Sequence, residues 1–262
     1  AYEIMPSLVG SDMCIRDSTG TDHLVEALHG RADIILTNGR GIHGPQMTEI
    51  TLLHMLALYR QVRRLARNQE THTWERFLPY VLETRNVAIL GLGAIAEHMA
   101  RCFKALGMTV YGISRTNRLV QGVEKVFSRD QITDAVSEID FLIVLVPHNS
   151  ETDKIVNAEV FDAMKPSACL INVARGGVVD EAALIEAINT GKIAGAGLDV
   201  FEVAPLPDNS PLWDMDNVYI SPHSSSDSPD LWTQRRQILE DQVRRFVEGR
   251  PLAFVCDTQR GY

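Results

Sequence analysis

The stretch Val87-Ala88-Ile89-Leu90-Gly91-Leu92-Gly93-Ala94-Ile95-Ala96-Glu97-His98-Met99-Ala100 decides the fold. Four apolar residues at its start predict a buried strand, and apolar residues at helical spacing after the glycines predict a helix. Two glycines one residue apart allow a tight turn and a close approach of the backbone to a ligand. Because unpaired N–H groups and the helix dipole favour phosphate, this strand–turn–helix pattern is typical of a dinucleotide site, with Ala96 at the third small position. By itself, the stretch fits an ordinary glycine-containing turn equally well.

The composition of the chain narrows the class of protein. Its 262 residues suffice for one large domain or two modest ones, and 45% hydrophobic and 23% charged residues are typical of a globular protein. A net charge of −9 argues against nucleic acid or an anionic membrane as the main partner. No apolar run approaches the roughly 18 residues of a membrane span, and the N-terminus lacks a secretory signal. We therefore expect a cytoplasmic protein. Its four scattered cysteines show no metal-like pairing, so no metal site is expected.

The first part of the chain shows weak patterns and then one long helix. Residues 1–18 carry neither a clear strand nor a helical period, whereas 24–28 suggest a short helix and 34–37 a short strand. Thr48 is a candidate N-cap for a helix that runs to about Arg67. The first half of this helix is apolar nearly all round, which predicts that it is buried.

The second half of the same helix carries a basic stripe, formed by Arg60, Arg63, Arg64 and Arg67. Such a stripe can bind an anion, but a solvated or subunit-facing surface is the more common use. Residues 68–86 are interpreted as an arm or connector that leads to the first buried strand.

From residue 87 onward, strands and helices alternate. Strands are predicted near 87–90, 109–113, 141–146, 169–173, 194–200 and 218–221. Helices are predicted near 94–106, 130–137, 158–165 and 180–190, and an amphipathic helix from Leu231 to Val247 precedes an extended tail. Near-continuous apolar strands that alternate with helices predict an α/β fold, with a doubly wound parallel (Rossmann) sheet covered on both faces.

Ligands of such sheets bind beyond the carboxyl ends of the strands, so the residues that follow each strand form the candidate site. After the second strand comes Ser114-Arg115-Thr116, where a site for NAD would carry an acid for the ribose hydroxyl. A guanidinium flanked by two hydroxyls instead suits a 2′-phosphate. NADP(H) is therefore favoured as the cofactor and NAD(H) stays possible, because Arg115 can also be a solvated loop residue.

Later strand ends carry polar residues suited to a reaction. Arg175 precedes two glycines, a pattern that suits binding of a carboxylate or a polarised carbonyl better than a structural ion pair. Asp199 ends a strand rich in Ala and Gly and is expected to face the crevice, whereas Glu202 is interpreted as a solvated acid. His223 follows a proline, a position suited to general acid–base chemistry, and His148 is a second candidate. These residues beside a dinucleotide site predict hydride transfer to a carbonyl next to a carboxylate. The histidines interpreted as structural are His23, His29, His43, His54, His72 and His98.

Four long motifs resemble the D-isomer-specific 2-hydroxyacid dehydrogenase family, which includes glyoxylate/hydroxypyruvate reductases. They are GLGAIA at 91–96, INVARGGVVDE at 171–181, GAGLDVFE at 195–202, and SPLW through NV to PH at 210–223. The resemblance covers the chain from about Thr19 to Tyr262. It implies a dinucleotide-binding domain at 48–223, inserted into an incomplete flavodoxin-like substrate domain formed by 1–47 and 224–262. It also implies a homodimer, formed through the long helix and arm at 48–86, and a small 2-oxo acid as substrate.

The resemblance further implies roles for individual residues. Arg175 would orient the carboxylate and carbonyl of the substrate, and His223 would be the proton donor in reduction. Asp199 would contact the nicotinamide carboxamide, while the backbone of Thr19 and Gly20 would receive the substrate carboxylate. The run Ser114-Arg115-Thr116 is similar to that of members that use NADP(H). The predicted cofactor-binding residues are Gly91, Leu92, Gly93, Ala94, Ile95, Ser114, Arg115, Thr116, Val146, Pro147, Thr152, Val173, Ala174, Arg175, Asp199, His223 and Ser225.

One departure from the family pattern bears on catalysis. The family's catalytic acid pairs with the histidine and favours the imidazolium, but Ala204 occupies its position in Val203-Ala204-Pro205-Leu206. His223 is then expected to be a weaker and less well oriented acid, a loss that can cost orders of magnitude in rate. Glu202 lies two residues away, an offset that disfavours it as a substitute.

A second departure concerns the N-terminus. Family members usually carry more strands and helices before the segment that matches Thr19, so much of the substrate domain is expected to be absent. The stretch from Gly10 to Ser18 fits nothing in the family and resembles translated adapter sequence, which suggests a truncated reading frame with a spurious start.

Two functions are therefore carried forward. The leading prediction is an NAD(P)-dependent reductase of small 2-oxo acids, of the glyoxylate/hydroxypyruvate type, with impaired activity. The alternative, favoured by Ala204, is a weakly active or inactive nucleotide-binding dimer that acts as a sensor or scaffold.

Overall fold

The computed structural model describes residues 13–16, 34–39 and 41–255 of the chain. The chain divides into two compact units, a larger one formed by 44–226 and a smaller one to which the flanking segments 1–43 and 227–262 belong. The larger unit extends slightly beyond the predicted 48–223 at both ends. No helix among the described residues is long and apolar enough to cross a membrane.

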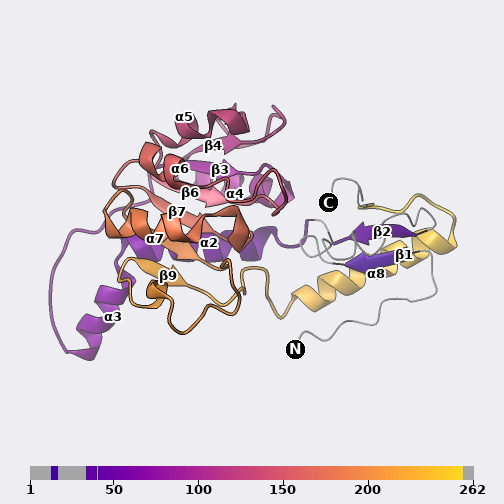
Figure 1. Cartoon of the computed structure of the whole chain (residues 1–262). Coiled ribbons are helices and arrows are strands. Elements are labelled where there is room, and N and C mark those ends of the chain that lie inside the picture. The colour runs from indigo at the N-terminus through magenta and orange to yellow at the C-terminus, as the bar shows by residue number, and fades with distance from the viewer. Residues whose placement is uncertain (1–12, 17–33, 40, 256–262) are drawn as a thin grey trace. The chain divides into compact units, whose positions relative to one another are not determined.

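The larger unit is built on a seven-stranded sheet, in which all neighbouring strands are parallel and follow the order β5-β4-β3-β6-β7-β8-β9 (Figure 1). The strands are β3 (Asn86–Leu90), β4 (Thr109–Ile113), β5 (Lys125–Phe127), β6 (Phe141–Val144), β7 (Cys169–Asn172), β8 (Gly195–Leu198) and β9 (Val218–Ile220). The strand order reverses between β3 and β6, and ligands of such sheets bind beyond the carboxyl ends of the strands at this point. The predicted doubly wound parallel sheet is confirmed.

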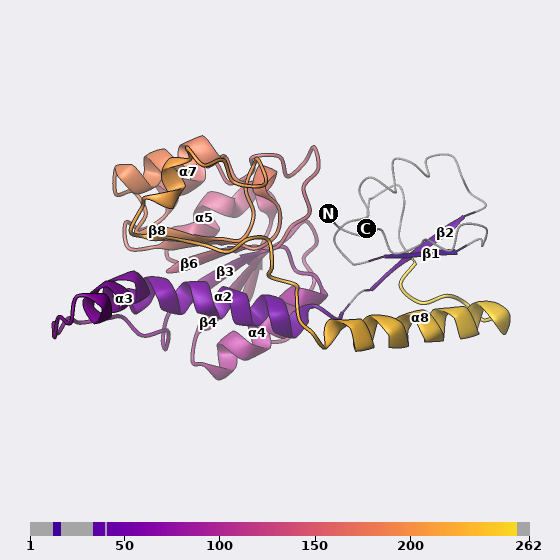
Figure 2. The same ribbon diagram turned by 90° about the horizontal axis from the view of Figure 1, so that it is seen from below.

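Helices cover both faces of this sheet (Figure 2). One face carries α2 (Gly44–Tyr59) and α4 (Ala94–Ala105), and the other carries α5 (Ile132–Val136), α6 (Ala158–Ala163) and α7 (Glu181–Asn189). The remaining pieces are α3 (Val62–Glu70) and the 3₁₀ turns η1 (Arg129–Gln131), η2 (Gly176–Val178) and η3 (Pro211–Trp213).

The central strand β6 shows why this sequence forms a two-sided sheet. All four of its side chains are fully buried. Leu142 and Val144 pack into the cluster that includes α5, α6 and α7, whereas Phe141 and Ile143 pack into the cluster with α2 and α4. A strand covered on both faces needs an apolar side chain at every position rather than an alternation. Each such burial contributes roughly 1.5–3 kcal/mol, so this strand anchors both layers of the core.

The smaller unit, within its described residues, holds β1 (Met13–Arg16), β2 (Ile35–Asn38) and α8 (Leu231–Val247). The strand and helix predicted for the last two are confirmed. In contrast, β1 lies where no strand is expected from the sequence. Four residues are too few to show a period, and parallel pairing with β2, Met13 opposite Ile35, supplies the backbone hydrogen bonds.

The long helix differs from its prediction at both ends. It begins at Gly44 with Pro45 in its first turn, as suits proline. Thr48 is therefore not an N-cap; its hydroxyl instead donates to the Gly44 carbonyl, 2.6 Å away, within the helix. Gln61 adopts a left-handed conformation (φ 51°), which separates α2 from α3.

Two further expectations are corrected. The first half of the helix is not buried all round, because Leu53 and Leu56 are exposed on the side of α2 that the described chain does not cover. In addition, β5 was not predicted, since its three residues at the edge of the sheet pair only with β4 and are too few to show a period.

Candidate active site

The glycine turn after β3 has the geometry that close approach to a ligand requires. Gly91 has a φ of 104°, and a Cβ there would lie 2.9 Å from the Leu145 carbonyl carbon and from Val146 Cγ1. Its N–H donates to the Ile113 carbonyl, which joins the turn to the end of β4. Gly93 is the N-cap of α4, and a Cβ on it would meet no atom within 4 Å. The helix N-terminus therefore faces open space, as an anion site needs.

The other residues of this turn support it by packing. Leu92 lies over the backbone of β4, because a Cβ on Gly112 would come 2.6 Å from Leu92 Cδ1. Ala94 and Ile95 open the helix, and Ala96, at the third small position, is buried against the core. Arg118, which sequence analysis did not select, donates to the Leu92 carbonyl at 2.9 Å.

Two of the three residues predicted to favour a 2′-phosphate line a small pocket at the ends of β4 and β5. Its volume is about 230 Å³, and Ser114 and Arg115 line it. Ser114 Oγ accepts from the Thr116 N–H, which holds the turn. Arg115 Nη1 lies 3.3 Å from Glu151 Oε2, and Arg129 Nη1 lies 3.2 Å from the same oxygen. Two guanidinium groups thus share one carboxylate oxygen beside the pocket.

The turn after β6 holds three predicted cofactor residues. Val146 is buried and packs against Gly91, and Pro147 follows it. Thr152 is fully buried, and its hydroxyl donates to the Pro147 carbonyl at 2.6 Å and accepts from the Asn149 N–H at 2.9 Å. In this structure, therefore, the Thr152 side chain fixes the shape of the turn.

A ladder of hydrogen bonds along the backbone, the first of them donated by the Asn172 side chain, links Arg175, Asp199 and His223, which follow the neighbouring strands β7, β8 and β9. Buried Asn172 donates from Nδ2 to the Arg175 carbonyl (3.0 Å), and its own carbonyl accepts from the Asp199 N–H (3.0 Å). The Asp199 carbonyl in turn accepts from the His223 N–H at 2.9 Å. The three predicted residues are therefore connected to one another at the carboxyl ends of neighbouring strands.

The loop that carries Arg175 packs directly on the next loop. A Cβ on Gly176 would lie 1.9 Å from the Phe201 carbonyl, so only glycine fits there. Val173 and Ala174 are buried, and the half-buried Arg175 donates from Nη1 to the Ala174 carbonyl.

Asp199 is the centre of the loop that carries His223. Its carboxylate is fully buried, and Oδ1 accepts from Ser221 Oγ (2.5 Å) and the Ser224 N–H (3.0 Å), while Oδ2 accepts from the Ser225 N–H (3.0 Å). The carboxylate of Asp199 is therefore not exposed to a crevice, which differs from the expectation. Its observed contacts organise the loop instead, and Ser225 takes part through its backbone.

His223 is exposed and has a left-handed backbone (φ 54°). Among the residues that the structure describes, none makes a hydrogen bond or ion pair with its ring. Glu202 is committed elsewhere, since Oε1 lies 3.0 Å from Lys154 Nζ and accepts from the Glu181 N–H at 3.1 Å. Glu202 thus caps α7 and does not take the place of the acid absent at Ala204.

The second histidine candidate has a different environment. His148 Nε2 lies 2.7 Å from Asp153 Oδ1, and the ring packs over Gly177, where a Cβ would come 2.7 Å from Nε2. Thr19 and Gly20, predicted to bind the substrate carboxylate, lie outside the described residues.

Several residues at this edge were missed by sequence reasoning. Asn172 and Ser221 are polar residues at the ends of apolar strands, a signal that could have marked them. His54 was interpreted as structural, yet its Nε2 lies 3.0 Å from Ser221 Oγ. Burial lowers the pKa of His54, against an opposing effect of the Asp199 charge. A histidine on an otherwise apolar helix needs a polar partner, and this requirement was the available signal.

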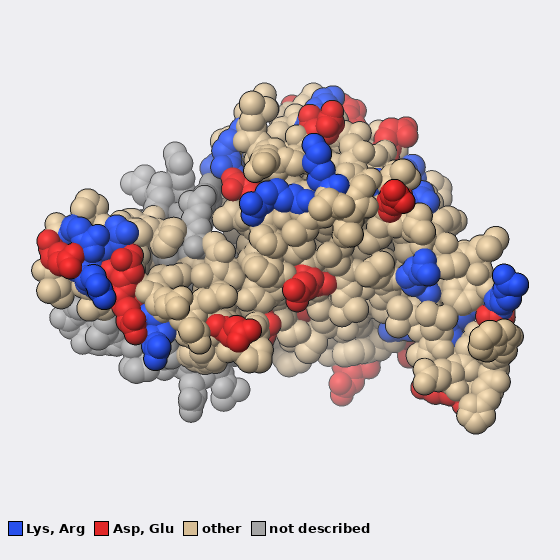
Figure 3. Space-filling model, turned by 180° about the vertical axis from the view of Figure 1, so that it is seen from behind, with Lys and Arg blue, Asp and Glu red and all other residues tan. Residues whose placement is uncertain are grey.

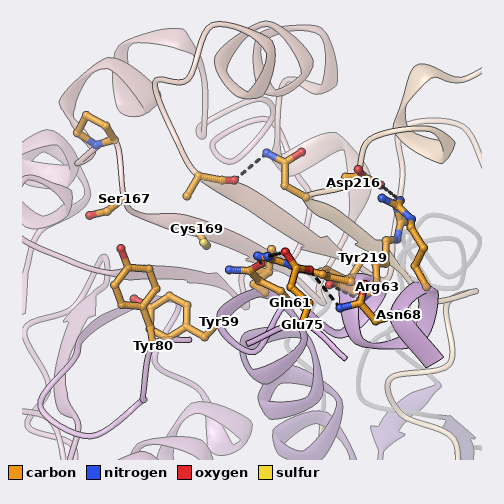
Figure 4. Close-up of a pocket in the computed structure, with 16 residues that line it drawn as sticks. Tyr59, Gln61, Arg63, Asn68, Glu75, Tyr80, Ser167, Cys169, Asp216 and Tyr219 are labelled. Atoms are coloured by element: carbon orange, nitrogen blue, oxygen red, sulfur yellow. Dashed lines mark hydrogen bonds and ion pairs between the residues drawn. The ribbon is translucent and has the colours of Figure 1, made fainter. Parts of the chain in front are cut away.

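A cavity of about 680 Å³ lies at the amino ends of the strands, opposite the carboxyl ends described above (Figure 4). Arg63, Arg64 and Arg67 line it, and each has a partner within the chain. Arg64 pairs with Glu75 (2.6 Å) and Arg67 with Asp216 (2.8 Å), while Arg63 lies over the Tyr219 ring and donates to the Met215 carbonyl. Because this cavity lies at the amino ends of the strands, it is separate from the predicted cofactor site.

On the face of the molecule that Figure 3 shows, neither sign of charge forms a patch of its own. Lys and Arg side chains are interspersed with Asp and Glu over the face shown in Figure 3. Within the described part of the chain, no group of three or more His, Cys, Asp or Glu side chains is placed to hold a metal ion.

Comparisons with known proteins bear on this site. The family model described as D-isomer specific 2-hydroxyacid dehydrogenase, NAD binding domain, matches residues 52–225. Glyoxylate/hydroxypyruvate reductase A of Photorhabdus laumondii is 31% identical over 220 residues, which are 84% of this chain and 69% of that protein.

Solved structures agree with the sequence matches. The NADPH-dependent glyoxylate/hydroxypyruvate reductase of Sinorhizobium meliloti, in complex with NADP and sulfate, superposes with a TM-score of 0.85 at 31% identity, covering 96% of this chain and 80% of that one. A D-isomer specific 2-hydroxyacid dehydrogenase from Xanthobacter autotrophicus, in complex with NADPH and MES, gives 0.84 at 34% identity, covering 95% and 79%.

These relatives are named as reductases and dehydrogenases, so they give no support to the alternative of a sensor or scaffold. The matched motifs, the parallel sheet and the hydrogen-bonded strand ends all agree with membership of the same family. The chain belongs to the D-isomer specific 2-hydroxyacid dehydrogenase family, a family of NAD(P)-dependent oxidoreductases.

Proposed function

We propose that the protein reduces a small 2-oxo acid, of the glyoxylate or hydroxypyruvate type, with NADPH. The observation that carries the proposal is the backbone ladder that links Arg175, Asp199 and His223 at the carboxyl ends of β7, β8 and β9. The names of the relatives support the choice of substrate class and of cofactor.

The residues at the strand ends fit a bound dinucleotide. A Cβ on Gly91 would clash with Leu145 and Val146, so only glycine permits this tight turn, and the open N-terminus of α4 at Gly93 suits a pyrophosphate. Arg115 and the neighbouring hydroxyls suit a 2′-phosphate, which would compete with Glu151 for the guanidinium. When bound, the nicotinamide supplies the hydride.

The chemistry asked of the chain is binding and proton delivery. Arg175 is proposed to hold the substrate carboxylate and the carbonyl oxygen, where a planar guanidinium can bind bidentately. During reduction, His223 would give a proton to the carbonyl oxygen of the substrate, so that with the hydride supplied by the nicotinamide the product would be the 2-hydroxy acid. Asp199 holds the His223 loop, and because its carboxylate is buried, a contact with the nicotinamide carboxamide would require this loop to shift. Thr19 and Gly20 are proposed to add backbone N–H groups to the carboxylate.

The absence of an acid at Ala204 sets the expected rate. Without a carboxylate to orient the imidazole and stabilise its charge, proton delivery from His223 is slow, by analogy with other histidines that lose an orienting carboxylate. Residues 48–223 are proposed to form the dinucleotide-binding domain, which also carries Arg175 and His223, and residues 1–47 and 224–262 to form part of the substrate domain.

A homodimer formed through α2 and the arm at 71–85 is part of the proposal. Trp74 and Leu78 on this arm are 96% and 95% exposed, and Leu53 and Leu56 are exposed on α2. Apolar side chains gathered on one helix and arm are typical of a subunit interface.

Reduction of a small acid with NADPH is consistent with action in the cytoplasm.

The test follows NADPH oxidation by the purified chain with glyoxylate and with hydroxypyruvate, in parallel with NADH. We expect turnover that is faster with NADPH, and we expect Arg115→Ala to abolish that preference. Tight NADPH binding without turnover of any small 2-oxo acid would contradict the proposed reaction, and tighter binding of NADH would contradict the cofactor assignment.

A further inference from the structure

A chain of buried polar groups runs from α2 to the loop that carries His223. His54 Nε2 lies 3.0 Å from Ser221 Oγ, which lies 2.5 Å from Asp199 Oδ1. All three residues are buried. Buried polar groups are expensive unless they are paired, so this chain is a built feature of the interior.

The direction of the hydrogen bonds follows from the chemistry of the three groups. A carboxylate can only accept, so the Ser221 hydroxyl proton points to Asp199. The serine oxygen is then left to accept, which requires that His54 donates from Nε2. Burial lowers the pKa of His54, which favours the neutral ring, and the bond to Ser221 then places the ring proton on Nε2. Only a donor at position 54 completes this chain.

The loop that carries His223 lies at the Asp199 end of this series of hydrogen bonds. Among the described carboxylates, Asp199 alone holds this loop. Asp199 accepts from the N–H groups of Ser224 and Ser225, and its carbonyl accepts from the N–H of His223. His223 itself has a left-handed backbone, which persists only where surrounding contacts impose it. Displacement of the Asp199 carboxylate would therefore displace the His223 ring.

The sequence makes room for His54 at β8. A Cβ on Gly197 would lie 2.5 Å from His54 Cβ, so the helix approaches the strand more closely there than another residue would permit. The glycine brings the imidazole within reach of Ser221, one strand further along the sheet.

We propose that His54 is a positioning residue, which acts through Ser221 and Asp199 to hold His223 where it delivers its proton. The inference rests on the proposed function, in which His223 is the proton donor. It goes beyond that function because it assigns a role in the reaction to a residue of α2, a helix that covers one face of the sheet.

The test separates a donor from mere bulk at position 54. His54→Gln keeps an N–H donor, whereas His54→Met keeps a comparable volume without a donor. The control variant Thr51→Val removes a different buried polar group from the same helix, a hydroxyl that donates only to the Met47 carbonyl. The readouts are kcat and KM with NADPH and glyoxylate, and the hydrogen exchange of the Ser224 and Ser225 amides.

We expect His54→Met to lower kcat roughly 10–100-fold, as displacement of a reacting group does, with the KM for NADPH nearly unchanged. The two amides should exchange about tenfold faster. His54→Gln should restore both readouts, and Thr51→Val should change neither. Wild-type kcat and exchange in His54→Met would overturn the proposal, as would equal losses in the Met and Gln variants.

Two provisions keep the outcome decisive. If His54→Met does not fold, Ser221→Ala tests the same link from its other side, and wild-type kcat in that variant overturns the proposal. If the unsubstituted protein reduces no 2-oxo acid, the proposed function fails. Amide exchange in the same variants then still decides whether the chain from His54 holds the loop.

Discussion

The carboxyl and amino ends of the same strands use polar residues in different ways. At the carboxyl ends, the Asn172 side chain donates to one backbone group and accepts from another, and the Asp199 carboxylate accepts from two backbone N–H groups, so that both fix the course of the loops. At the amino ends, charged side chains neutralise one another, as Arg64 does with Glu75 and Lys165 with Asp140 (3.0 Å). Fixed backbone positions are what a reaction requires, so the difference supports the proposal that the carboxyl ends of the strands form the reactive edge, although the larger cavity lies at the amino ends.

The first way to break this comparison is to remove one guanidinium from each edge. Arg175→Gln should lower kcat/KM for glyoxylate by roughly 10³-fold or more, because a bidentate charged contact to the reacting acid is lost. Arg64→Gln is the matched control at the amino edge and should leave kcat/KM unchanged. Steady-state kinetics with both variants decide the matter; equal losses would show that the edges do not differ in function.

The second prediction restores the acid that the reactive edge lacks. Ala204→Glu should raise kcat about 10²-fold or more, because a carboxylate beside His223 orients the ring and favours its charged form. Activity should also persist to higher pH, since protonated imidazole stays available there. Initial rates between pH 6 and 9 measure both effects. The matched variant Ala204→Gln, which lacks the charge, should gain much less; an equal gain would argue against an acid–histidine pair.

The sequence predicts the long strands and the motif residues at their carboxyl ends better than the short elements, for a physical reason. Long apolar strands, a glycine turn and motif residues such as Arg175 carry strong local signals, so the sheet and its order of strands and helices are confirmed. In contrast, β5 and the break at Gln61 depend on tertiary contacts that leave little trace in the local pattern.

The same limit explains which site residues were missed. Ser221 and His54 lie far apart in the sequence and meet only when α2 packs against the sheet beside β9. The burial of Asp199 likewise follows from the loop at Ser221–Ser225 folding over it. Single strand ends can be recognised from the sequence, whereas the contacts between them cannot.

The third prediction uses the lowered pKa of His54 at the reactive edge. The unfolded chain binds a proton at this histidine near its ordinary pKa, whereas the folded chain resists it. The free energy of unfolding should therefore fall as the pH drops below that ordinary value, by at most about 1.4 kcal/mol per pH unit from this group. Urea unfolding at pH 7.5 and 5.5 measures the change, and His54→Gln should make it smaller. An identical change in both proteins would contradict this assignment.

The fourth prediction concerns the carboxylate shared by Arg115 and Arg129. Glu151→Gln should tighten NADPH binding several-fold, because a 2′-phosphate no longer competes with a carboxylate for the two guanidinium groups. NADH binding should not change. Calorimetry with both nucleotides tests this, with the exposed Glu159→Gln as the matched control for loss of one negative charge. Equal tightening in both variants would indicate a general effect of net charge.

The smallest effect is expected at the amino edge, where Arg67 and Asp216 form an ion pair whose side chains are 62% and 72% exposed. Solvent screens such a pair, so a double-mutant cycle with Arg67→Gln and Asp216→Asn should give a coupling of only about 0.2–1 kcal/mol in the free energy of unfolding. NADPH affinity and kcat should stay unchanged, because neither side chain reaches the carboxyl ends of the strands. A loss of kcat in these variants without a loss of stability would mean that the two edges are coupled, and the division between a reactive edge and a stabilising edge would no longer hold.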